Sequence, residues 1–68
     1  MENSILVLWD EIKTLIESID LDVRKNAAGN ASAGVRARKG LRTLKSKSAI
    51  LTKVTVETEK SRKTDKAE

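Results

Sequence analysis

The 68-residue sequence contains no cysteine, histidine or proline, and its single aromatic residue is Trp9. Without cysteine there is no disulfide, and without cysteine or histidine the common zinc sites are excluded. Glycine occurs only at positions 29, 34 and 40. Because residues that break helices are so scarce, the sequence predicts an almost entirely helical chain.

Long apolar runs are also missing. The run Ile5–Trp9 is followed at once by Asp10 and Glu11, whereas a membrane-spanning helix needs about 20 apolar residues. The start of the chain carries Glu2 rather than the basic residues of a signal peptide. We therefore expect a soluble, cytoplasmic protein that does not enter a membrane. Docking on a membrane surface through Trp9 is a weak alternative, because that segment is acidic where anionic lipid favours basic residues.

Motifs for catalysis are absent as well. The sequence has no glycine-rich phosphate loop, no nucleophile elbow and no cluster of metal ligands. A general base would have to be a carboxylate, and the acidic residues fall on the predicted solvent faces, away from any cleft. We expect no enzyme activity, no cofactor, no metal and no small-molecule substrate.

Charge, in contrast, is abundant and unevenly distributed. The net charge of +4 divides into −5 over residues 1–23 (six acids, one base), +9 over residues 24–53 (nine bases, no acid) and zero over residues 54–68 (four of each). Such a separation indicates either internal charge pairing or a surface for a polyanion. The nine bases are the predicted nucleic-acid-binding residues: Arg24, Lys25, Arg36, Arg38, Lys39, Arg42, Lys45, Lys47 and Lys53.

The apolar residues follow a helical period. In the first half they recur at steps of three and four: Ile5, Leu8, Ile12, Leu15 and Ile19, with Trp9, Ile16 and Val23 in a second row beside them. This stripe is wide enough for a core-facing helix, over about residues 4–27 and capped by Asn3 or Ser4. Trp9 is predicted to pack in the core, within or beside a core shared by two subunits.

Gly29 and Asn30 suit a turn, because glycine ends many helices and asparagine caps the next one. A second helix is predicted over about residues 31–62. Residues 63–68 are predicted to form a frayed C-terminal tail. A turn at 28–30 this short makes the helices antiparallel; one continuous helix through Gly29 is the alternative. Gly34 and Gly40 indicate close helix packing, the alternative being that they only loosen the helix.

The predicted fold is therefore all-α, an antiparallel two-helix hairpin that forms one domain over residues 1–62. A single hairpin of this size buries too little apolar surface to offset the ordering of its chain. With disulfides and metals excluded, self-association remains. We expect a homodimer that forms a four-helix bundle.

Several short segments resemble one known family. They are Gly29-Asn30, Ala33-Gly34, Arg36-Ala37-Arg38, Leu41 with Leu44, and Lys53-Val54-Thr55-Val56-Glu57. Over about residues 25–60 the chain is similar to the bacterial linker-histone-like family of chlamydial histone-like nucleoid proteins and their short relatives. The resemblance implies DNA binding and chromosome compaction with little sequence preference. The long Lys/Ala-rich tail of the chlamydial form has no counterpart before Glu68, so condensation by a tail is not expected.

The basic segment favours non-specific binding to duplex DNA by a nucleoid-associated protein, since its bases would neutralise phosphates. Arg38, Arg42 and Lys45 share one stripe of the second helix, with Arg36, Lys39 and Lys53 beside it and Lys47 nearer the apolar row. No aromatic residue lies there for stacking single strands; RNA remains an alternative ligand. The alternative function is a structural hairpin that docks by its basic face on an acidic protein or on a large ribonucleoprotein or virion assembly.

Overall fold

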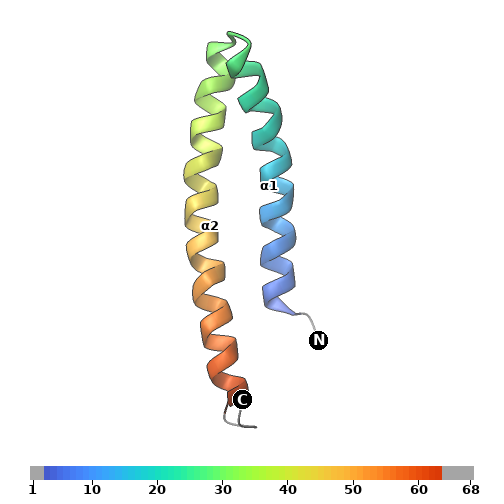
Figure 1. Ribbon diagram of the computed structural model, residues 1–68, viewed down its shortest axis with the longest axis vertical. Coiled ribbons are helices and arrows are strands. Elements are labelled where there is room, and N and C mark those ends of the chain that lie inside the picture. Colours follow the sequence, from blue (N-terminus) through green and yellow to red (C-terminus); the bar gives the residue numbers. More distant parts are fainter. Residues whose placement is uncertain (1–2, 64–68) are drawn as a thin grey trace.

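The chain folds into two long helices. The structure, a computed structural model, describes residues 3–63. Helix α1 spans Ser4–Ala27 and α2 spans Ala31–Lys63, and no strand occurs in this described part. The helices are in extensive contact and run antiparallel, so that α2 reaches past the start of α1 (Figure 1). The predicted all-α fold is confirmed; of the expected tail, Lys63 ends α2 and residues 64–68 lie outside the described residues.

Asparagine side chains cap both helices at their N-termini. The Asn3 Oδ1 atom accepts hydrogen bonds from the backbone N–H groups of Ile5 and Leu6, at 3.0 and 3.3 Å. The Asn30 Oδ1 atom accepts from the N–H of Ala33 at 2.9 Å. Each cap satisfies donors that the first helical turn leaves unpaired.

The turn between the helices depends on Gly29. Its φ of 109° lies in a region that side chains with a Cβ rarely adopt. Next to it, the Asn26 side-chain amide donates to the Asn30 carbonyl oxygen at 3.2 Å. The chain therefore reverses between Ala27 and Ala31 in a tight, internally hydrogen-bonded loop, which places α2 directly alongside α1.

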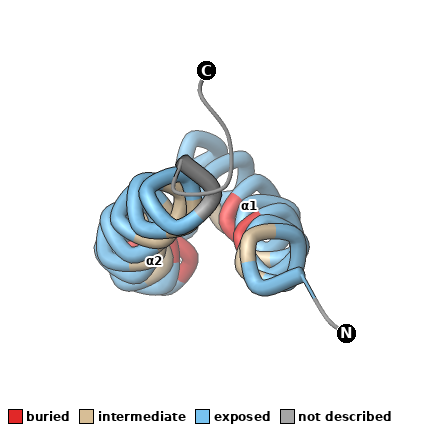
Figure 2. Tube along the Cα trace, turned by 90° about the horizontal axis from the view of Figure 1, so that it is seen from below, coloured by how far each residue is buried: buried red, intermediate tan, exposed pale blue. Residues whose placement is uncertain are grey.

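The core between the helices is narrow. Its buried apolar residues are Ile12 and Ile19 from α1 and Ala33 and Ala37 from α2, and Figure 2 shows them where the two helices face each other. Gly40 allows the two helices to approach each other closely, because a Cβ at this position would lie 2.7 Å from Ile19 Cγ1. The predicted close packing at Gly40 is thus confirmed.

A second row of apolar side chains stays outside this core. Trp9, Ile16 and Val23 are 45%, 44% and 44% exposed, and Leu41 on α2 is 46% exposed. In a two-helix hairpin, only one row of α1 can face α2, and the Ile12–Ile19 row does so. The prediction that Trp9 packs in the core is therefore not met within a single hairpin.

Candidate nucleic-acid interface

The outer side of α2 carries a row of cations that we call the basic ridge: Arg38, Lys39, Arg42, Lys45 and Lys53. All five side chains are exposed. At about 100° per residue, they lie on the side of the helix opposite the buried Ala33 and Ala37. Among the described residues, none of the five forms an ion pair. The ridge therefore presents uncompensated positive charge to the solvent.

Two other predicted binding residues point toward α1 instead. The Arg36 Nε atom lies 3.1 Å from Asp22 Oδ1, and the Lys47 Nζ atom lies 3.1 Å from Glu11 Oε1. Both ion pairs cross from α2 to α1 on the same broad face of the hairpin. Their cations are partly neutralised and less available to a polyanion than those of the ridge.

The remaining two predicted residues, Arg24 and Lys25, sit in the last turn of α1. Arg24 is held by Asp20 one turn earlier, with Nε 3.0 Å from Oδ2. Lys25 is exposed and makes no ion pair among the described residues. A cation at this position interacts favourably with the carbonyl end of the helix dipole. Both residues are separated from the ridge by the width of the hairpin.

Lys60 is a residue that the sequence analysis left out. It follows Arg42 by eighteen residues, which is about five full helical turns, so it continues the line of the ridge. Its side chain is exposed. Residues 54–68 carry equal numbers of acids and bases. Because this segment has no net charge, Lys60 was not among the predicted binding residues. Its helical spacing from Arg42 and Lys53 was the signal that could have found it.

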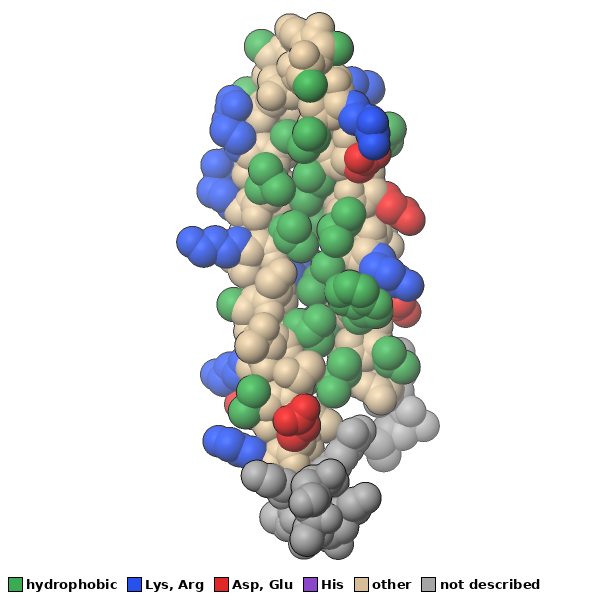
Figure 3. All heavy atoms as spheres, in the orientation of Figure 1, with side chains coloured by type: hydrophobic (Ala, Val, Ile, Leu, Met, Phe, Trp, Pro, Cys, Tyr) green, Lys and Arg blue, Asp and Glu red, His purple; other side chains and the backbone are tan. Residues whose placement is uncertain are grey.

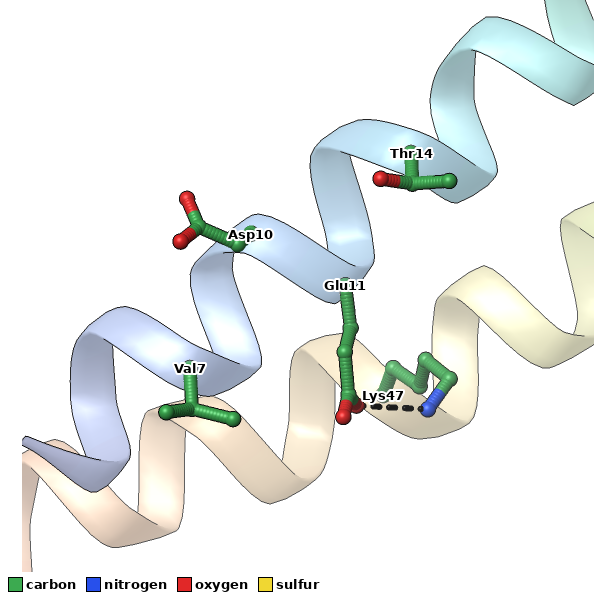
Figure 4. Close-up of a pocket in the computed structure, with 5 residues that line it drawn as sticks. All are labelled: Val7, Asp10, Glu11, Thr14 and Lys47. Carbon is green, nitrogen blue, oxygen red and sulfur yellow. Dashed lines mark hydrogen bonds and ion pairs between the residues drawn. The ribbon is translucent and has the colours of Figure 1, made fainter. Parts of the chain in front are cut away.

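A shallow depression lies beside one of the inter-helix ion pairs (Figure 4). It is lined by Val7, Asp10, Glu11, Thr14 and Lys47. The Glu11 carboxylate and the Lys47 ammonium point toward each other across it and form the ion pair already described. Within residues 3–63, no group of three or more acidic side chains is placed to hold a metal ion. Of the charged groups of this depression, Glu11 and Lys47 join the helices, and Asp10 pairs with Lys13 on α1.

Figure 3 shows how the charges and the apolar side chains divide over the surface. Hydrophobic side chains follow the seam between the helices on the face in view, and Lys and Arg side chains follow the outer edge of α2. Acidic side chains, together with a few basic ones, line the outer edge of α1. Neither helix of the described part has a stretch apolar and long enough to cross a bilayer.

These features define a class of small all-α protein: a helical hairpin with one basic edge and one apolar face. Comparison by sequence gives the family. The profile of histone H1-like protein Hc1 matches residues 8–61, which is most of the chain. The protein belongs to this family, as the resemblance over residues 25–60 predicted, and the match also takes in most of α1. No curated protein and no solved structure matches the chain.

Proposed function

We propose that the protein is a nucleoid-associated, DNA-compacting protein of the cytoplasm that binds duplex DNA without sequence preference through the basic ridge of α2. The observation that carries this proposal is the row of five exposed cations with no acidic partner among the described residues. Membership of a histone H1-like family supports DNA binding in general.

The dimensions of the ridge suit a nucleic-acid backbone. From Arg38 to Lys53 it extends about 22 Å along α2, which exceeds the width of the major groove of B-DNA, about 12 Å. A straight ridge of this length can contact phosphates on both sides of a groove. Arginine donates two hydrogen bonds to one phosphate, while lysine acts as a movable point charge. Neither contact reads a base, which explains the lack of sequence preference.

Duplex DNA is favoured over single strands because the ridge contains no aromatic residue. Single-strand binding proteins stack bases on aromatic side chains, and Trp9, the single aromatic residue, belongs to α1. Structured RNA offers similar phosphates, and a binding experiment with duplex RNA distinguishes it from duplex DNA.

We further propose that the protein acts as a homodimer that forms a four-helix bundle.

The proposal is tested by measuring duplex DNA binding as a function of salt. If about five phosphates are neutralised, the logarithm of affinity falls with the logarithm of salt with a slope of about −4 to −5. Arg38→Glu combined with Arg42→Glu should weaken binding to all duplex sequences alike and flatten this slope. Single-stranded DNA and duplex RNA, titrated in parallel, show which polyanion is preferred.

A matched pair of single variants separates the ridge from net charge. Arg42→Glu and Lys13→Glu change the charge equally, but Lys13 lies on α1 beside Asp10. Arg42→Glu should reduce affinity markedly and Lys13→Glu only slightly, with helicity unchanged in both. Equal losses would mean that total charge, not the ridge, determines binding. Retention of a cellular complex after digestion of DNA and RNA would favour docking on an acidic protein instead.

A further inference from the structure

Four of the exposed apolar residues of the hairpin share one broad face. We define the apolar face as Trp9, Ile16 and Val23 of α1 and Leu41 of α2, each more than two-fifths exposed. The three residues of α1 are seven positions apart and therefore share a stripe. At about 100° per residue, Trp9 lies about 160° around α1 from Glu11, and Leu41 lies about 140° around α2 from Arg36. The inter-helix ion pairs thus occupy the opposite broad face.

The narrow core of the hairpin leaves the apolar face without a partner within the chain. The chain exposes 5473 Å² for a mass of 7.5 kDa, about 1,200 Å² more than the roughly 4,250 Å² that is typical of a compact protein of that mass. The hairpin core holds only two isoleucines and two alanines. Stable interfaces bury at least about 1,200 Å² over both partners, so an interface on the apolar face must extend beyond these four side chains to their neighbours on both helices.

We propose that a second copy of the chain covers the apolar face in a parallel arrangement. The two-fold axis runs along the helices, so that α1 of each protomer packs on α2 of its partner and both turns lie at the same end. The two basic ridges then lie on opposite edges of the bundle. One dimer can bind two DNA duplexes and bridge them, a consequence that rests on the proposed DNA binding.

Side-chain size favours this arrangement over the antiparallel one. The Glu11–Lys47 and Asp22–Arg36 pairs show which positions of the two helices lie at the same height. By this register, Trp9 is level with the segment 48–52, and Val23 is level with the segment 34–37.

In a parallel dimer these large side chains of α1 meet small ones of the partner's α2: serine and threonine opposite Trp9, and glycine and alanine opposite Val23. An antiparallel dimer sets the stripe of α1, which includes Trp9, against its own copy. It sets the stripe of α2, which is small apart from Leu41, against its own copy. Interdigitation of large with small residues gives an evenly packed core. The packing therefore selects the parallel arrangement.

Charge selects the same arrangement. The solvent edge of α1 carries Glu17 and two acids that are paired on the same helix, Asp10 with Lys13 and Asp20 with Arg24, so it is close to neutral. The outer edge of α2 carries the basic ridge. In a parallel dimer the outer edge of each α1 lies beside the partner's ridge, and the two ridges are held apart. In an antiparallel dimer the two ridges lie side by side and repel each other, which disfavours that pairing.

The orientation can be measured by distances between spin labels, because the chain has no cysteine of its own. Ser32→Cys places a label beside the turn, at an exposed position of α2. The parallel dimer predicts a label separation well below the length of α1, whereas the antiparallel dimer predicts about 36 Å or more. A long distance, or no distance between protomers at all, overturns the proposal.

Ser4→Cys, at the opposite end of the hairpin, gives a matched control. Labels at Ser4 in both protomers should again be close in a parallel dimer. A mixed dimer with one label at each position should give the long distance. The antiparallel dimer reverses both results, so the two samples together leave no ambiguous outcome.

Bridging is tested separately by asking whether a bead-bound duplex captures a second, labelled duplex through the protein. Ile16→Asp and Leu41→Lys, each on the apolar face, should reduce capture of the second duplex more than binding of the first, measured at concentrations where circular dichroism shows that the variant is still helical. Leu21→Asp, at a leucine that is 61% exposed and away from that face, is the matched control and should capture normally. The unsubstituted protein decides the two proposals separately. If it fails to bind the first duplex, the proposed function is overturned; if it binds the first duplex but captures no second one, bridging is overturned.

Discussion

At the scale of single residues, ion pairing divides the basic side chains into two groups. Arg36 and Arg38 are two positions apart, yet Arg36 is held by Asp22, whose side chain is only 17% exposed, and Arg38 has no acidic partner among the described residues. By sequence alone, both residues belong to one predicted binding set. Residue type alone could not separate them, because the acid opposite each arginine depends on the register between the helices.

The first prediction compares these two arginines. Arg38→Gln should lower the affinity for duplex DNA severalfold and reduce the salt slope by about 1, as for the loss of one phosphate contact. Arg36→Gln should change both quantities much less, since its guanidinium is already occupied. Binding isotherms at several salt concentrations measure the difference. Equal effects of the two substitutions would show that the Asp22 ion pair does not limit Arg36.

The second prediction concerns Gly40. Alanine at this position gains about 1 kcal/mol of helix propensity, but its Cβ would lie 2.7 Å from Ile19 Cγ1. Overpacking typically costs about 1–3 kcal/mol, so Gly40→Ala should lower the melting temperature. In an Ile19→Ala background the obstruction is gone, and the same change should instead stabilise. A destabilisation of equal size in both backgrounds would mean that Gly40 does not serve close packing.

At the scale of elements, both helices and their junction follow from local signals. The steps of three and four between apolar residues of α1 and the Gly29-Asn30 pair were visible in the sequence, and both helices adopt asparagine caps. Which apolar row of α1 would face α2 could not be predicted. The Trp9 and Ile12 rows are similar in hydrophobicity, and the choice depends on how closely Gly34, Ala37 and Gly40 let the backbones approach.

The third prediction concerns the cap of α2. Asn30→Ala removes the hydrogen bond to the Ala33 N–H and should cost about 1 kcal/mol. The change lies at the junction, so it should destabilise the hairpin cooperatively. Asn3→Ala removes the equivalent bonds at the free end of α1 and should mainly fray one turn. Thermal unfolding followed by circular dichroism distinguishes them, and a larger loss from Asn3→Ala would contradict this ranking.

At the scale of the whole molecule, the hairpin separates its surfaces by chemistry. The outer edge of α2 is basic, the outer edge of α1 is largely acidic, one broad face carries the inter-helix ion pairs and the other is apolar. The sequence alone predicted the charge separation and the need for self-association. It placed Trp9 in a core because the apolar stripe of α1 is broader than one neighbouring helix can cover. In the proposed dimer, Trp9 would report on assembly rather than on the hairpin itself.

The last prediction uses this property. For a protein whose folded state is a dimer, each tenfold rise in concentration adds about 1.4 kcal/mol to the apparent stability by mass action, so the melting temperature should rise with concentration. Trp9→Ala should cost on the order of 3 kcal/mol if the ring is buried in the dimer and far less if it stays 45% exposed as in the hairpin. Trp9→Ala should also weaken the dependence of the melting temperature on protein concentration.

Leu21→Ala, at a more exposed side chain outside the apolar face, is the control. It should leave both the stability and its dependence on concentration nearly unchanged. A folded, helical monomer at micromolar concentration in a sedimentation experiment would refute the dimer directly.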